Sequence, residues 1–296
     1  MSGKDKLLQY LDSVGIDALF LIRESFLGYK YRKSNNKLYE TDAVIPTQLI
    51  RLYYSLNPSN VEFDNMKKSF INKYVKNESK LEGVNDEEIH GKQEIAGFAD
   101  MYEYLHTDEV DENFSFYTLK DLHRKLFSHA KYPDCAGQFR NIDVYLPGTG
   151  NELSEWSTIW YELRKLDPEI LYLHEQAKIV KEKCDPDELL EFLDRCVELK
   201  CKLIKIHPFL DGNGRTIRAF TNKLLEDSGL PPIYIKSNER SEYHKALNLA
   251  NNENDYTKIK SFYRYKICDS IIELDINERV KKDNKAKVKV KDITNK

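Results

Sequence analysis

The sequence lacks any long apolar run. No uninterrupted apolar stretch approaches the ~20 residues that a helix needs to cross a bilayer. The first fifteen residues, MSGKDKLLQYLDSVG, are polar and broken up by charges, so they do not have the pattern of a signal peptide. We therefore expect a protein without a membrane segment, located in the cytoplasm.

An excess of positive charge and a paired set of cysteines are also absent. The 46 Lys and Arg are outnumbered by 49 Asp and Glu, which gives a formal net charge of -3 at pH 7 and argues against a nucleic-acid partner. The five cysteines form no CxxC pair and their number is odd. Reduced thiols in a reducing compartment are the simplest interpretation.

Helical patterns dominate what is present. Hydrophobic residues make up 41% of the 296 residues, enough for a sizeable core. Apolar residues recur at helical spacing over 118–127, where Thr118 begins a pattern that resembles a capping box. A longer helix is predicted over 185–206, with Pro186 in its first turn, and a third over 214–229.

Strand signals are few. The segment FRNIDVYLPGTG alternates apolar and polar residues and then stops at Pro147 and Gly148, which predicts a short hairpin. From about residue 278 the chain is lysine-rich and almost free of large apolar groups, so we expect a disordered tail.

The junction between the second and third predicted helices contains groups that bind phosphate. It reads HPFLDGNGR, residues 207–215. Gly212 and Gly214 permit close backbone approach immediately before a helix, whose first N–H groups lack partners and carry the positive end of the helix dipole. Such a helix start binds anions, above all phosphate. Arg215 and Arg218 add two guanidiniums in the first turns, which suits a polyphosphate.

Three more side chains of this stretch carry chemistry. Asp211 offers a hard oxygen ligand beside the phosphate site, where a nucleotide would complete the shell of Mg²⁺. His207 titrates near neutral pH and could take a proton from an attacking hydroxyl. Asn213 could orient a phosphate oxygen. Singly, each residue has an ordinary structural explanation, such as a helix end or a tight turn. Their combination at this spacing indicates a functional site.

The same stretch identifies a family. HPFLDGNGRTIR, residues 207–218, matches at every defining position the HPFx[DE]GNGRxxR signature of Fic domains, most of which are protein adenylyltransferases. GQFRNIDVYLPG, residues 137–148, resembles the Fic flap, a hairpin that aligns the target by strand addition, and KDLHRKLFS resembles the preceding helix. The resemblance covers roughly residues 60–270. It implies a mainly α fold, a Fic-fold helical bundle with a short β-hairpin flap over the active site.

The resemblance also implies a role for each signature residue. His207 would deprotonate a target hydroxyl, which attacks the α-phosphate of ATP and expels pyrophosphate bound to Mg²⁺, with Asp211 as the metal ligand. The expected phosphate-binding residues are Gly212, Asn213, Gly214, Arg215 in the β-phosphate region and Arg218 at the γ-phosphate. In NERSEYHKALNLAN, Tyr243 and Asn251 are candidates for adenine contacts, and the alternative for Tyr243 is a core aromatic.

A second motif resembles the inhibitory pattern [ST]xxxE[GN], whose glutamate pairs with the second arginine of the signature. NESKLEG, residues 77–83, supplies Glu82 and Gly83, but Glu78 stands where Ser or Thr is expected and Ser79 comes one residue late. An ordinary helix end with Gly at C′ is the alternative. Because Glu82 precedes the signature in the same chain, the resemblance implies intramolecular inhibition without a separate antitoxin.

We expect an N-terminal helical extension over 1–60, a Fic domain over 61–275 with an inhibitory helix near 70–83, and a lysine-rich tail over 276–296. The expected function is an autoinhibited, Mg²⁺-dependent protein adenylyltransferase that moves AMP from ATP to a Ser, Thr or Tyr hydroxyl of a target docked along 137–148, or of itself. Removal of AMP, another phospho-transfer at the same site, and a non-catalytic nucleotide-binding interaction module are the alternatives. A homo-oligomer is compatible with the sequence.

Overall fold

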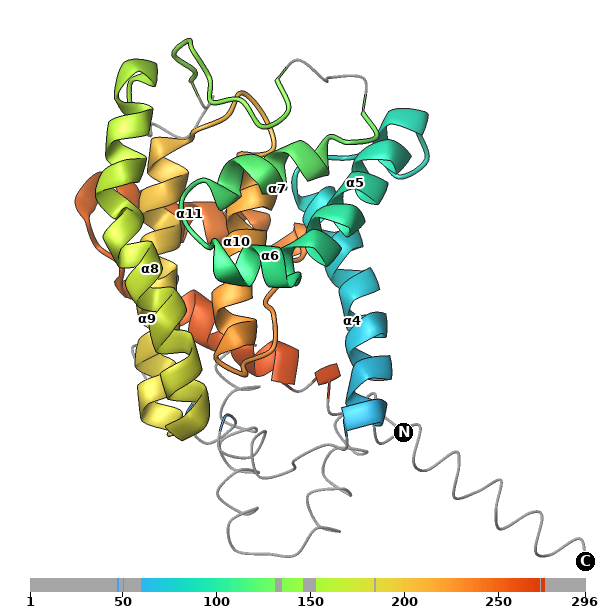
Figure 1. The fold of residues 1–296 in the computed structure, drawn as a ribbon, viewed down its shortest axis with the longest axis vertical. Helices are drawn as coiled ribbons and strands as arrows, with labels where there is room; N and C mark the ends of the chain where they lie inside the picture. The colour runs from blue at the N-terminus through green and yellow to red at the C-terminus, as the bar shows by residue number, and fades with distance from the viewer. Residues whose placement is uncertain are drawn as a thin grey trace, which may run out of the picture.

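The computed structural model describes residues 47, 50, 60–130, 135–145, 153–183, 185–271 and 273–274, and these residues are mainly helical, with no strand assigned among them. The expectation of a mainly α fold is confirmed. The expected extension (1–60) lies almost wholly outside the described residues, and the tail (276–296) lies entirely outside them. The helices, labelled as in Figure 1, are α4 (Asn60–Leu81), α5 (Ile89–Leu105), α6 (Asp108–Glu112), α7 (Thr118–Leu126), η1 (Trp156–Thr158), α8 (Ile159–Lys183), α9 (Pro186–Ile206), α10 (Asn213–Asp227), η2 (Ser237–Glu239) and α11 (Arg240–Glu253). A further helix covers 257–271.

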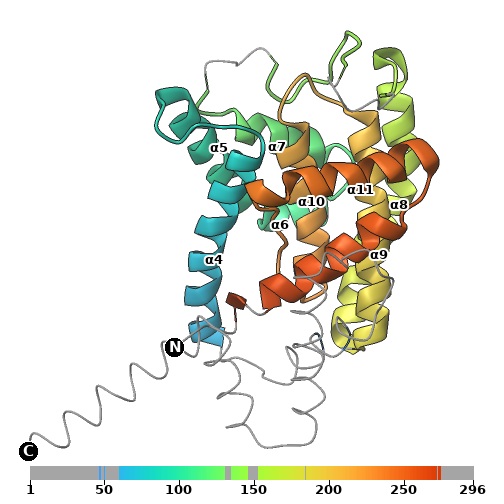
Figure 2. The same ribbon diagram turned by 180° about the vertical axis from the view of Figure 1, so that it is seen from behind.

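The helix α10 lies at the centre of the bundle. It packs against α5, α7, α8 and α9, and both views of the ribbon show it surrounded by these helices (Figures 1 and 2). Ile217 and Phe220 are fully buried on it. The α9–α10 junction lies at the same end of the molecule as segment 135–145 (Figure 1). The core therefore fixes the first turn of α10 beside that segment.

The start of α9 follows from its sequence. The Asp185 carboxylate accepts the N–H groups of Asp187 (2.9 Å) and Glu188 (3.0 Å), and Pro186 occupies the first turn. The Glu188 side chain pairs with Lys183 instead of closing a capping box. The helix then runs directly into His207, as predicted.

Two other expectations have different outcomes. The helix α7 begins at Thr118, but the Thr118 hydroxyl accepts the N–H of Ser115 (3.1 Å) and Asp121 pairs with Arg124 (2.6 Å), so the predicted capping box is wrong. The described part of the predicted flap, 137–145, is turn and extended backbone without an assigned strand. Residues 146–148 lie outside the described residues, so the hairpin stays a prediction.

The helix α4 ends as the 77–83 motif requires. Gly83 has φ 82°, its N–H donates to the carbonyl of Lys80 (3.1 Å), and the N–H of Val84 donates to the carbonyl of Ser79 (3.0 Å). This is a Schellman-type helix end, in which a left-handed glycine satisfies the last carbonyls. Glu82 therefore directly follows the last turn of α4, and the backbone hydrogen bonds of this helix end hold it in place.

Among the described helices, none combines the length and apolar character that crossing a membrane would need.

Candidate active site

The signature begins at a helix end of unusual geometry. His207 caps α9 with φ 51°, in the left-handed region. Asn213 holds the turn that follows, because its side-chain oxygen accepts the N–H of Phe209 (2.8 Å) and its side-chain nitrogen donates to the Phe209 carbonyl (2.7 Å). Both polar groups of this buried amide are thus used within the loop. In this arrangement Asn213 shapes the loop, and the second N–H of its side-chain amide is the donor left for the phosphate contact expected from the sequence.

The imidazole of His207 is prepared to accept a proton. Burial lowers the pKa of His207 to about 4, against a smaller opposing effect of the Ile204 carbonyl. The ring is therefore neutral at pH 7, which is the form that a general base requires.

The start of α10 has the geometry of an anion site and already has a carboxylate against it. Gly212 has φ 72°, and a Cβ there would come within 2.8 Å of the Phe127 ring. A Cβ on Gly214 would lie 2.2 Å from a carboxylate oxygen of Glu82 and 2.8 Å from Nη1 of Arg218. The Glu82 carboxylate therefore lies directly against the first turn of α10, where orphan N–H groups attract negative charge. An anionic group already sits where the sequence predicts phosphate.

A glutamate of α5 binds the guanidinium of the first signature arginine. Arg215 is buried, its Nη1 donates to Oε2 of Glu94 on α5 (2.5 Å), and its guanidinium lies over the Phe127 ring at 5.6 Å. Its Nη2 is 4.0 Å from Oδ2 of Asp211. Sequence reasoning missed Glu94, because nothing in the local pattern of α5 distinguishes this glutamate from a solvated one.

Two carboxylates hold the second signature arginine. Arg218 donates from Nε to Oε2 of Glu78 and from Nη2 to Oε1 of Glu82 (2.5 Å). Burial raises the pKa of Glu82, but Arg218 and, to a smaller extent, Arg215 lower it by more, so the net pKa lies below its usual value. The expected Glu82–Arg218 pair is present. Glu78, taken from the sequence only as a departure from the pattern, is the other partner, and its spacing of four residues from Glu82 on one helix face could have found it.

A residue of the flap segment fixes the peptide of His207. The buried Arg140 donates from Nε to the His207 carbonyl (2.8 Å), from Nη1 to the Ile142 carbonyl (2.8 Å) and from Nη2 to the carbonyls of Ser154 and Ile206. Its own N–H donates to the Pro208 carbonyl (2.9 Å). Arg140 therefore ties segment 135–145 to the end of α9 where His207 begins.

His123 makes a second tie between the same parts. Its Nδ1 accepts the N–H of Gly137 (2.8 Å), so Nε2 carries the proton and donates to the Asp211 carbonyl (2.9 Å). The ring stacks on Phe209 with centroids 3.9 Å apart. Burial lowers the pKa of His123 to about 4, which keeps the ring neutral. Neither His123 nor Arg140 was singled out from the sequence.

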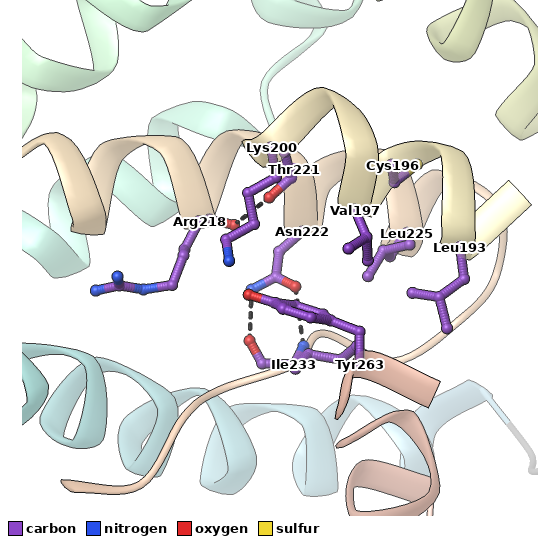
Figure 3. Close-up of a pocket in the computed structure, with 10 residues that line it drawn as sticks. All are labelled: Leu193, Cys196, Val197, Lys200, Arg218, Thr221, Asn222, Leu225, Ile233 and Tyr263. Atoms are coloured by element: carbon purple, nitrogen blue, oxygen red, sulfur yellow. Dashed lines mark hydrogen bonds between the residues drawn. The ribbon is translucent and has the colours of Figure 1, made fainter. Parts of the chain in front are cut away.

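The candidate adenine residues lie on α11. Tyr243 is 1% exposed, and its hydroxyl accepts a hydrogen bond from Lys200 (2.8 Å), which favours the core-aromatic alternative. Asn251 is buried, and its Nδ2 has no partner among the described residues, so it can still donate to a ligand. Figure 3 shows Lys200 of α9 and Arg218 of α10 at one small pocket, whose lining includes Tyr263. Burial lowers the pKa of Lys200 to about 7.

Asp211 suits a metal bound together with phosphate. Its side chain is 77% exposed, and Oδ1 accepts the N–H of Gly212 (2.6 Å). The described residues contain no cluster of three or more His, Cys, Asp or Glu side chains that could hold a metal ion alone. A single exposed carboxylate next to a phosphate site fits Mg²⁺, which commonly takes one or two carboxylates with substrate phosphates.

The fold and the site define a helical domain in which a histidine, a glycine-rich helix start and two buried arginines meet at one helix junction. Residues 113–225 match the family model described as Fic/DOC family, so the chain contains a Fic domain.

Curated relatives carry the same family name. The chain is 32% identical over 190 residues to "Protein adenylyltransferase Fic" of Aedes aegypti, with 62% of this chain and 33% of that protein covered. It is 28% identical over 179 residues to the protein of the same name from Nematostella vectensis, with 58% and 36% covered. The chain thus spans about a third of the length of these relatives.

Solved structures share the fold. A Fic domain containing signaling protein from Bacteroides thetaiotaomicron has a TM-score of 0.63 at 17% identity, covering 78% of this chain and 97% of that one. Fic-1 from C. elegans has a TM-score of 0.57 at 20% identity, covering 88% and 75%.

Proposed function

We propose that this protein is an autoinhibited adenylyltransferase that transfers AMP from ATP to a Ser, Thr or Tyr hydroxyl of a target protein or of itself. The observation that carries the proposal is the Glu82 carboxylate, which lies against the first turn of α10 and on Arg218, at the place expected for a phosphate. The names of the curated relatives support AMP transfer as the reaction.

In the proposed reaction the oxygen of the target hydroxyl attacks the α-phosphorus of ATP. The bond from that phosphorus to the bridging oxygen of pyrophosphate breaks, and the hydroxyl proton passes to His207. The neutral imidazole, with its pKa near 4, is free to take the proton. Pyrophosphate leaves, and the target carries AMP. No covalent bond to the enzyme is needed, because the site works by positioning and by stabilising charge.

The phosphate groups would be bound by the start of α10 and by the two arginines. Gly212 and Gly214 allow close approach to the orphan N–H groups, Arg215 serves the β-phosphate region, and Arg218 serves the γ-phosphate. Mg²⁺ bound by Asp211 and the phosphates would neutralise the charge of the leaving pyrophosphate.

Glu82 would act as the brake. Its carboxylate and the γ-phosphate compete for Nη2 of Arg218 and for the space above Gly214. A bound nucleotide with Glu82 in place would therefore have its γ-phosphate displaced from the productive position.

A target would dock along the flap segment 137–148. The described part supports this role, since Ile142 and Tyr145 are both exposed there and Arg140 connects the segment to His207. Target side chains that contact this segment would therefore lie close to the general base.

Intact-mass spectrometry of the Glu82→Gly protein incubated with ATP and Mg²⁺ tests the proposal. We expect an added mass of AMP on the protein or on an offered target, and no addition in the matched Glu82→Gly, His207→Ala variant. An equal addition in the His207→Ala variant would refute the mechanism. Tight ATP binding without any transfer would instead support the non-catalytic binding module.

A further inference from the structure

Glu78 and Glu82 contact Arg218 in different ways. Glu78 is 0% exposed, whereas the Glu82 side chain is 33% exposed. Glu82 accepts a hydrogen bond from Nη2 of Arg218, and its Oε1 lies against Gly214 in the first turn of α10, where Nη1 of Arg218 also lies. Glu78 accepts from Nε, which leaves both Nη atoms to the anion site. Of the two carboxylates, the structure places only Glu82 in the path of a phosphate.

Glu78 is also fixed from a second side. Its Oε1 accepts the N–H of Ile235 (3.1 Å), while Oε2 accepts from Arg218, so both oxygens are used. The chain around Ile235 is itself held, because the Asn222 side chain donates to the Ile233 carbonyl (2.7 Å) and accepts the Ile233 N–H (2.9 Å) (Figure 3). Glu78 therefore cannot leave without breaking bonds to α10 and to segment 230–236.

A buried guanidinium needs a partner at every stage of the reaction. Arg218 is buried, and leaving a buried charge unpaired is strongly unfavourable. When Glu82 withdraws and before a phosphate arrives, Glu78 is the carboxylate that still pairs with Arg218 among the described residues. Because Glu78 binds Nε of Arg218, the two Nη atoms of the guanidinium are left facing the anion site.

We propose that Glu78 is a positioning residue: a permanent counter-ion that holds Arg218 by its Nε edge and aims its Nη edge at the γ-phosphate, while Glu82 alone is exchangeable. This inference rests on the proposed function of the site. According to this inference, Glu78 is necessary for recognising the third phosphate of ATP. Its role therefore differs from that of Glu82, which would act as the brake.

Glu78→Gln tests the idea with almost no change in volume. Each oxygen of Glu78 accepts from a different donor, Ile235 or Arg218, and in glutamine one of these oxygens is replaced by an NH2 group that only donates, so one of the two contacts is lost. The readout is the ratio of the dissociation constants of ADP and ATP, measured by calorimetry with Mg²⁺ and with His207→Ala in every protein to prevent turnover. With Glu82→Gly we expect ATP to bind about tenfold more tightly than ADP. Adding Glu78→Gln should bring the ratio close to one, while ADP affinity stays within about twofold.

A purely structural role would weaken both nucleotides together, so an unchanged ratio overturns the inference. If the Glu82→Gly protein ignores ATP altogether, the proposed function fails instead. Should the combined variant not fold, Glu78→Gln is made with Glu82 retained, where Arg218 keeps a partner. That protein should bind ATP more weakly than its Glu78 parent, because Arg218 then depends on Glu82. Tighter ATP binding would mark Glu78 as a second brake and refute the assignment.

Discussion

The affinity of the site for ATP should rise when the charge of Glu82 is removed. In the native arrangement one charge-assisted bond of 2.5 Å joins Glu82 to Nη2 of Arg218. Such bonds contribute about 1.5–3 kcal/mol, and the partial exposure of Glu82 to solvent places this one near the lower end. About 1.5 kcal/mol corresponds to roughly a tenfold change in the dissociation constant of ATP.

Two substitutions separate charge from occupied space. Glu82→Gln keeps the size of the side chain but only a neutral oxygen for Arg218, so it should recover part of the tenfold effect. Glu82→Gly also clears the space above Gly214 and should bind ATP most tightly. Calorimetry in the presence of Mg²⁺, with His207→Ala in all proteins, measures the order of their ATP affinities. Raising the salt concentration should narrow the difference in the ATP dissociation constant between the Glu82 protein and the Glu82→Gln protein. If all three proteins bind ATP equally, Glu82 does not compete with phosphate and the brake is wrong.

Three other perturbations have defined outcomes. Gly214→Ala should abolish labelling even in the Glu82→Gly protein, because a Cβ there fills the space over the first turn of α10. Mass spectrometry measures the labelling, and an AMP addition to the doubly substituted protein would contradict the prediction. The His207 ring should stay neutral down to about pH 5 and protonate near pH 4, so labelling should be lost only as the pH falls through that value. An NMR titration, with His207→Gln as the control for assignment, measures the pKa of the ring, and an ordinary value near 6.5 would contradict the prediction. Arg140→Lys should slow labelling by about a hundredfold through misplacement of His207 while leaving ATP affinity unchanged, and equal losses in rate and affinity would contradict a positioning role.

The sequence predicted those features that depend on neighbours along the chain. The α9 start follows from Asp185 and Pro186, and the α9–α10 junction follows from the glycines and arginines of one short motif. The Glu82–Arg218 contact spans 136 residues, yet it was predicted because the resemblance to a known inhibitory pattern supplied the long-range information. Helix propensity alone would have assigned Glu82 to an ordinary helix end.

The contacts that escaped prediction join distant elements. Glu94 meets Arg215 across 121 residues, His123 meets Asp211 across 88, and Arg140 meets His207 across 67. Each depends on how whole helices pack, which a local pattern does not encode. The loop role of Asn213 escaped prediction for another reason, since an amide can serve a loop backbone and a phosphate equally well by its chemistry. Only the geometry of the turn assigns its groups to Phe209.

The signature is controlled at its two ends by different parts of the chain. At its first residue, Arg140 of the flap segment binds the His207 carbonyl, so under the proposed function a docked target would act on the general base. At its last residue, the end of α4 holds Arg218, so the proposed inhibition would act on the γ-phosphate. Among the described residues, the hydrogen-bond partners of Arg140 and of the two glutamates do not overlap, and unshared contacts favour independent free-energy effects. A target docked along the flap segment would therefore share no hydrogen-bonded residue with Glu82 among the described residues, and we expect docking and the release of Glu82 to be separate events.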